Sequence, residues 1–140
     1  MKNASVDTRD RIAARRWVQS AIALYETAGE KAVLAEIENP RGRFVLDDRC
    51  VFALDINGTL LAHPLESEMK GKVLIDLKDS DGKAFLRRII DISNNRGYGF
   101  VDYKWPHPES GKELSRTVFF EKVDRIIFCS GFYSSEEGFL

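Results

Sequence analysis

The chain has 140 residues, of which 44% are hydrophobic and 31% are charged, the proportions of an ordinary globular protein of one domain. Its formal net charge of -1 excludes a general positive field of the kind that binds nucleic acids or anionic membranes. No apolar run approaches the roughly 18 residues of a membrane-spanning helix, and no signal peptide opens the chain. We therefore expect one domain over residues 1–140, with no membrane insertion, that is either cytoplasmic or an excised part of a longer protein.

Two helices are predicted first. Over residues 7–27 the apolar positions recur at helical spacing, and a shorter amphipathic segment covers residues 30–38. The second helix ends before Pro40, because the residue preceding a proline is disfavoured in the α region. Four arginines occupy the early turns of the first helix. We expect a solvated face there rather than a nucleic-acid site, since no aromatic platform accompanies Arg9, Arg11, Arg15 and Arg16.

Residues 50–64 predict the first hairpin of a sheet. Apolar runs at 50–54 and 59–63 flank Asn57-Gly58, and both turn residues tolerate the positive φ that a two-residue type I′ turn requires. Pro64 has no amide hydrogen, so it should end the second strand.

The same stretch is similar to the DxDGT motif of haloacid-dehalogenase-type phosphatases, with Asp55 at the position of the nucleophile. In that family the second acidic residue is a general acid, a role that Asn57 cannot fill. That family also needs a parallel sheet, for which too few residues follow Leu60. We therefore expect a hairpin turn and no enzymatic activity.

One helix and three long strands are predicted in the second half. Residues 83–94 carry a wide apolar stripe that should lie on a sheet, and the helix should end in a left-handed cap at Asn or Gly within residues 94–97. Residues 98–105 alternate, and 113–123 and 125–133 are long enough to cross a sheet. The prediction is an α+β domain with a helical part (7–38) and a five-stranded antiparallel sheet with a helical crossover (44–133).

The two cysteines predict neither a metal site nor a disulfide framework. Cys50 and Cys129 are 79 positions apart, without CxxC spacing or a nearby histidine pair. We expect two small buried hydrophobic side chains and no cofactor.

Five blocks of sequence resemble the single Cache sensor domains of bacterial chemoreceptors and histidine kinases. They are LAHP (61–64), GKVLIDLKD (71–79), DGKAF (81–85), GFVDYKWPHP (99–108) and GFY (131–133), within a similarity that covers roughly residues 10–133. The resemblance implies a PAS-like antiparallel sheet with a long N-terminal helix behind it. It also implies a pocket on the other face, commonly for a short carboxylate such as acetate, propionate, pyruvate or lactate. Such domains usually face the periplasm, although this chain lacks the flanking membrane helices and the output domain.

A pocket for a small carboxylate needs a mostly apolar wall with a few converging hydrogen-bond donors. Arg116 could present a planar fork to a carboxylate, or it could be a charge at the sheet edge. His63 could face the ligand, or it could bond a nearby backbone carbonyl. His107, between two prolines, is expected to be an exposed loop residue. The candidate ligand-binding residues are His63, Tyr103, Trp105, Arg116, Phe119 and Tyr133, although aromatic residues in strands are also common in cores.

Three positions depart from the family pattern. Cys50 and Phe119 stand where the family often has tyrosine, and Cys129 stands where glycine is common. We expect a smaller or more apolar cavity that prefers acetate or propionate to polar hydroxy acids and dicarboxylates.

A small-molecule sensor is the first hypothesis for the function. The alternative is a non-catalytic interaction module with a degenerate pocket, forming a homodimer through the N-terminal helix. No nucleophile and base pairing or phosphate loop supports an enzyme.

Overall fold

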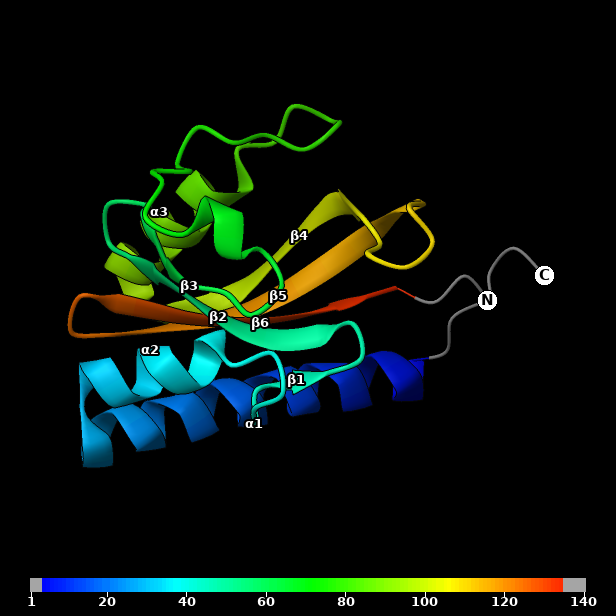
Figure 1. Ribbon diagram of the computed structural model, residues 1–140. Coiled ribbons are helices and arrows are strands. Elements are labelled where there is room, and N and C mark those ends of the chain that lie inside the picture. Colours follow the sequence, from blue (N-terminus) through cyan, green and yellow to red (C-terminus); the bar gives the residue numbers. More distant parts are fainter. Residues whose placement is uncertain (1–3, 135–140) are drawn as a thin grey trace.

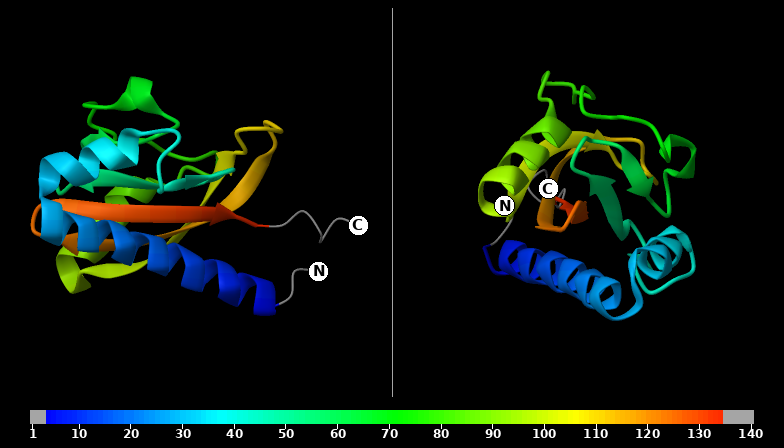
Figure 2. Two further views of the ribbon diagram at one scale, coloured as in Figure 1. Left: turned by 60° about the horizontal axis from the view of Figure 1, so that its bottom comes forward. Right: turned by 90° about the vertical axis from the view of Figure 1, so that its left-hand side faces the viewer.

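The computed structural model describes residues 4–134. The elements run α1 (Ala4–Ala28), α2 (Glu30–Glu38), β1 (Val45–Leu46), β2 (Arg49–Asp55), β3 (Leu60–Ala62), the 3₁₀ turn η1 (Ser67–Met69), α3 (Phe85–Arg96), β4 (Tyr98–Pro106), β5 (Glu113–Val123) and β6 (Ile126–Tyr133). Figure 1 shows the sheet between two layers, with α1 and α2 on one face and α3 with the preceding long connection on the other. The end-on view in Figure 2 shows the sheet curving between them. The predicted α+β architecture with its long N-terminal helix is confirmed.

The helices form where the apolar spacing predicts them. α1 turns Ala14, Val18 and Ala21 toward the sheet, where all three are buried. Gly29, with a φ of 91°, separates α1 from α2, and the bounds of α2 match the prediction. α3 begins two residues later than predicted and ends at Gly97, whose φ of 89° provides the left-handed cap.

The sheet is antiparallel throughout, in the order β1-β2-β6-β5-β4. It has six strands rather than the expected five, because the two residues of β1 pair with the start of β2. β3 pairs with the end of β2. Since β6 occupies the other edge of β2, β1 and β3 share one edge between them. Two residues are too short a strand to show the alternation from which strands are predicted.

The hairpin between β2 and β3 is present, but its turn is not the two-residue type I′ turn. The Gly58 amide donates to the Asp55 carbonyl (3.1 Å) and the Asp55 amide donates to the Thr59 carbonyl (2.9 Å), so the loop has three residues. Gly58 has a φ of 89°, whereas Asn57 is not in the positive-φ region. A three-residue loop with glycine at the left-handed position is the next commonest hairpin connection. The Asp55 carboxylate supports it by accepting the Asn57 and Thr59 amides at 2.8 and 3.0 Å.

Successive residues of the strands alternate between two separate cores. The core under α1 and α2 contains Val51, Phe119, Phe128 and Phe132. The core on the α3 side contains Phe52, Val118, Phe120 and Ile127, among others. Both faces of the central strands are therefore covered, each by its own core.

The arginines of α1 are not all on a solvated face. The guanidinium of Arg11 lies 4.7 Å from the ring centre of Phe100, and that of Arg15 lies 5.7 Å from the ring centre of Phe119. These are distances at which a cation is attracted to an aromatic face. Two of the four arginines thus help to hold α1 on the sheet.

Candidate ligand-binding site

A cavity of about 450 Å³ lies between the sheet and its cover on the α3 side. Its walls come from β2, β4, β5 and β6, from the first turn of α3, and from residues 65–77, which we call the cover segment. Most of the lining side chains are aliphatic or aromatic. The polar groups among them are Asp48, His63, Glu66, Tyr103, His107, Arg116 and Tyr133. A mostly apolar hollow with a few converging polar groups is the usual form of a small-molecule site.

Three of the polar side chains form one row across three strands. Tyr103 on β4 is paired with Arg116 on β5, and Arg116 is paired with Tyr133 on β6. The Arg116 Nε–H donates to the Tyr103 hydroxyl at 3.1 Å, and the guanidinium carbon lies 4.8 Å from the centre of the Tyr133 ring. Because residues paired in this way project from the same face of a sheet, the row presents one cation flanked by two phenols to the cavity.

Arg116 is only 6% exposed, and it forms no ion pair with any carboxylate among the side chains that the structure describes. Its neighbours do not supply a negative charge. Burial raises the pKa of Tyr103 to about 12 and that of Cys50 to about 11, so both are neutral near pH 7. A buried guanidinium is always charged, and a buried charge without an opposite charge is costly. This end of the cavity is therefore suited to an anion.

His63 is held as a neutral hydrogen-bond donor beside this row. Burial, reinforced by the charge of Arg116, lowers the pKa of His63 to about 4. Its Nδ1 accepts the amides of Leu65 and Glu66, both at 3.1 Å, so the neutral ring carries its proton on Nε2. The ring stacks on Phe52, with 5.2 Å between ring centres. The alternative of a bond to a backbone carbonyl is wrong for Nδ1, which accepts amides instead.

His107 is a cavity residue, and the expectation of an exposed loop histidine is wrong. Its side chain is 16% exposed, and its Nε2 lies 2.8 Å from the Asp48 carboxylate. The Nδ1 of His107 accepts the Glu109 amide at 3.2 Å. The same arrangement occurs at His63: in each case a His-Pro pair turns the chain and the ring accepts the amide two residues on. The repeated His-Pro pair was the signal in the sequence that could have identified His107.

The aromatic side chains of β4 form one wall. The rings of Tyr103 and Phe85 are stacked, with their centres 3.9 Å apart and their planes 4° apart. Trp105 packs edge-on against both rings. This cluster fixes the position of the Tyr103 hydroxyl, and through it the position of the Arg116 side chain.

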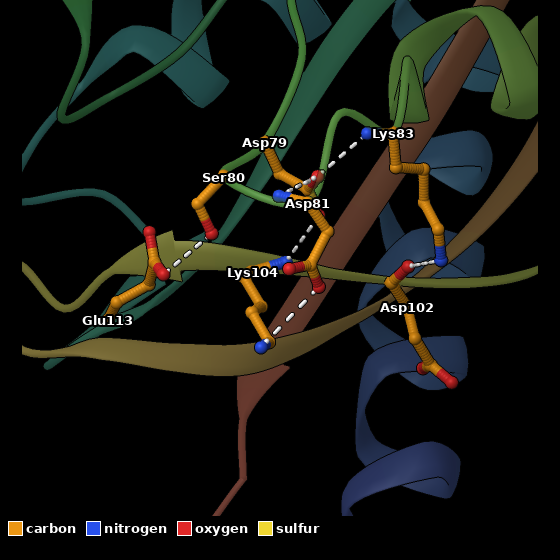
Figure 3. A network of polar contacts seen from close by, with 7 residues as sticks. All are labelled: Asp79, Ser80, Asp81, Lys83, Asp102, Lys104 and Glu113. Atoms are coloured by element: carbon orange, nitrogen blue, oxygen red, sulfur yellow. Dashed lines mark hydrogen bonds and ion pairs between the residues drawn. The ribbon is translucent and has the colours of Figure 1, made fainter.

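The buried carboxylate of Asp79 ties the chain that follows the cover segment to β4. Asp79 accepts the amides of Asp81 and Lys83 on one oxygen, at 3.0 and 2.8 Å, and the amide of Lys104 on the other at 3.0 Å. Figure 3 shows this network, in which Lys83 also reaches the carbonyl of Asp102. The hydrogen bond to the Lys104 amide, with those to the amides of Lys83 and Asp81, holds the pKa of Asp79 below its ordinary value although burial opposes this. The sequence predicted only a turn here.

Five of the six predicted site residues line the cavity: His63, Tyr103, Trp105, Arg116 and Tyr133. Phe119 does not line the cavity, so its prediction as a ligand-binding residue is wrong. It lies on the opposite face of β5, in the core beneath α1, because its offset of three positions from Arg116 is odd and successive residues of a strand point to opposite faces. Prediction missed Asp48, Glu66 and His107. Cys50 and Cys129 are free and buried, as expected.

The family model of the Cache domain matches residues 32–136, which is three quarters of the chain. The chain belongs to the Cache domain family. Within this Cache domain, none of the helices in residues 4–134 has both the length and the hydropathy needed to cross a membrane. No group of three or more His, Cys, Asp or Glu side chains in the same residues is placed to hold a metal ion.

Two curated relatives are signalling proteins. The chain is 30% identical over 78 residues to the sensor histidine kinase MctS of Rhizobium johnstonii, and 22% identical over 67 residues to the methyl-accepting chemotaxis protein McpP of Pseudomonas putida. The matches cover 56% and 48% of this chain. They cover only 17% and 12% of the two relatives, so the Cache domain corresponds to a small part of each.

Solved structures share the fold. A Cache chemosensory domain studied for carboxylic acid recognition has a TM-score of 0.78 at 20% identity, and the match covers 96% of this chain and all of the other, 100%. A methyl-accepting chemotaxis protein from Vibrio parahaemolyticus has a TM-score of 0.74 at 23% identity, covering 92% of this chain and 88% of that one. The predicted family and fold are confirmed.

Proposed function

We propose that this Cache domain is a sensor module that binds a small organic acid and passes its occupancy to a signalling or chemotaxis output. The acid belongs to the class that includes acetate, propionate, pyruvate and lactate. Its carboxylate lies against the guanidinium of Arg116, with the Tyr133 ring and the Nε2–H of His63 beside it. The cavity binds and releases the acid without chemical change.

The observation that carries this proposal is a buried cation that faces a cavity and has no carboxylate partner among the described side chains. A ligand carboxylate supplies the missing charge and can accept two parallel hydrogen bonds from a guanidinium. A structural neighbour is described as a domain for carboxylic acid recognition, which supports the choice of ligand class. The two curated relatives, a sensor kinase and a chemotaxis protein, support the signalling role.

The test is calorimetric titration of the purified domain with a panel of short acids, repeated for Arg116→Met. Hydrogen bonds to charged groups contribute about 1.5–3 kcal/mol each, so the variant should bind roughly 10- to 100-fold more weakly. Its unfolding temperature without ligand should be unchanged or higher, because removing an uncompensated buried charge is favourable. Arg125→Met, at an exposed position in the turn before β6, is the matched control and should bind like the parent.

Failure of every acid to bind would refute the proposal. A dimer in light scattering together with such a failure would favour the alternative of an interaction module with a degenerate pocket.

The proposal that the domain is not an enzyme has its own support at Asp55. That carboxylate is engaged with the amides of Asn57 and Thr59 inside the hairpin turn, where a nucleophile would have to be free to attack. Incubation with an aryl phosphate, with and without magnesium, should release no phenol above the rate of the Asp55→Ala variant.

A further inference from the structure

We propose that the preferred ligand is a monocarboxylate with an apolar body larger than that of propionate, such as valerate, hexanoate or phenylacetate. This inference rests on the proposed function of Arg116, and it specifies the rest of the molecule that Arg116 holds. It reverses the expectation, drawn from Cys50, Phe119 and Cys129, that the cavity suits the smallest acids.

The cavity is too long for a two-carbon acid to fill. Arg116 is paired with Tyr133, whereas Leu54, at the other end of the lining, is paired with Ile127. These positions are six residues apart along β6, which is about 20 Å at 3.3 Å per residue. A volume of about 450 Å³ lies within the range of sites that enclose drug-sized ligands. An acetate bound to Arg116 would leave most of this space to water against apolar walls.

The part of the lining remote from Arg116 is apolar. Leu54 and Leu60 come from the hairpin, and Leu74 comes from the cover segment beside it. None of these side chains has a hydrogen-bonding group. Because apolar surface gains free energy when it leaves water, a hydrocarbon body is the matching occupant, and hydroxyl groups in this region would lose their hydrogen bonds to water.

The charges of the lining match one carboxylate and oppose a second. Arg116 is the cation of the row, and His63 is neutral. The carboxylates of Glu66 and Asp48 also line the cavity, and Asp48 is engaged by His107 at 2.8 Å. A second carboxylate on the ligand would therefore add to the negative charge of this lining, with no further lysine or arginine among the described lining residues to compensate it.

The first experiment measures the dissociation constants of acetate, propionate, butyrate, valerate and hexanoate. We expect affinity to rise about fourfold with each methylene that is buried, until the cavity is filled. Affinity that is flat or falls beyond propionate overturns this inference and leaves the proposed function intact. The absence of binding for all five acids and for pyruvate and lactate overturns the proposed function itself, whereas binding of pyruvate or lactate alone overturns only this inference, so the two failures are distinguishable.

A variant locates the apolar body. Leu74 lies at the end of the cavity remote from Arg116, because its amide donates to the Gly58 carbonyl in the hairpin turn at 2.8 Å. Leu74→Phe narrows this end, and it should weaken hexanoate at least tenfold while leaving propionate unchanged. Val73→Phe, in the same segment at a position that is 64% exposed, is the matched control. Equal effects of Leu74→Phe on both acids would overturn the placement of the ligand body.

The last comparison tests the number of carboxylates. Glutarate should bind at least tenfold more weakly than valerate, which has the same chain length, and Glu66→Gln should reduce that ratio. Glu26→Gln, on an exposed position of α1, should leave the ratio unchanged. Glutarate binding as tightly as valerate to the parent protein would overturn the monocarboxylate assignment.

Discussion

The guanidinium of Arg116 lies directly against the backbone of Gly131. A Cβ atom at position 131 would come within 2.8 Å of Nη2 and 2.9 Å of Cζ. Atoms that are not bonded to each other do not approach so closely, so the Cβ atom would clash with the guanidinium. Glycine at this point of β6 therefore provides the space in which the arginine side chain lies flat across the sheet. The backbone of Gly131 does not require glycine for its φ, so the constraint is one of space.

Gly131→Ala should displace the guanidinium and weaken binding of the acid about tenfold or more, since misplacing a charged hydrogen bond forfeits much of its 1.5–3 kcal/mol. Titration calorimetry measures the effect. Gly99→Ala is the control, because its Cβ would meet Ile92 and Phe120 at 3.1 and 3.2 Å in the core and not the arginine. Similar losses of affinity in both variants would contradict the role given to Gly131.

Tyr103→Phe should destabilise the protein by about 1–3 kcal/mol, because the buried Nε–H of Arg116 would lose its acceptor. The aromatic stack with Phe85 is retained in this variant. Urea unfolding measures the difference. Tyr133→Phe should cost less, since the partly exposed Tyr133 hydroxyl donates to the Pro106 carbonyl, which water can reach. No measurable cost for Tyr103→Phe would show that the arginine does not depend on the Tyr103 hydroxyl.

The lowered pKa of His63 should make the protein less stable on acidification. Its pKa is about 4 in the fold, against 6.5 as the ordinary value, so the unfolded chain binds the proton more tightly. The free energy of unfolding should therefore fall as the pH is lowered from about 6.5 to about 4, by up to about 3 kcal/mol from this residue.

Comparison of the parent with His63→Asn isolates this contribution, because all other titrating groups are common to both proteins. The slope of stability against pH in this window should be smaller in the variant. Identical slopes in the two proteins would rule out a buried neutral imidazole at position 63.

Asp79→Asn should lower the unfolding temperature, because an amide oxygen cannot accept the three backbone amides that the two carboxylate oxygens accept now. The depressed pKa of Asp79 has a further consequence: its contribution to stability is present above the pKa of an unfolded aspartate and is lost as the pH falls through the folded value. Asp76→Asn, whose side chain is 85% exposed, should have little effect in the same thermal scan. An unchanged unfolding temperature in Asp79→Asn would mean that these hydrogen bonds are not needed to hold the cover segment in place.

Local patterns in the sequence predicted most of the fold. The residue before Pro40 ended α2 at the expected place, and the alternation of β4 assigned Tyr103 and Trp105 to one face. β1 escaped prediction because its pairing depends on a tight turn at Asp47, with a φ of 55°, and not on any periodic pattern. Asn57-Gly58 gave the position of the hairpin but not its loop length, since the Asp55 side chain helps to select the three-residue form.

The errors in the site have one physical origin, which is contact between distant parts of the chain. His107 looks exposed when only its flanking prolines are considered, and it is covered by Asp48, which is 59 positions away. On β5 every residue from Arg116 to Phe120 is buried, so no alternation of polar and apolar residues indicates which of them face the cavity. The face of Phe119 follows from its odd offset from Arg116 once Arg116 is known to face the cavity.

One strand of backbone separates the cavity at Arg116 from the layer that holds the long N-terminal helix. Arg116 and Phe119 project from opposite sides of β5, and the Phe119 ring carries the guanidinium of Arg15 from α1 at 5.7 Å. A displacement of this strand on ligand entry would reach α1 without passing through any intervening element. The helix and the cavity are thus mechanically adjacent, although they lie in different layers of the molecule.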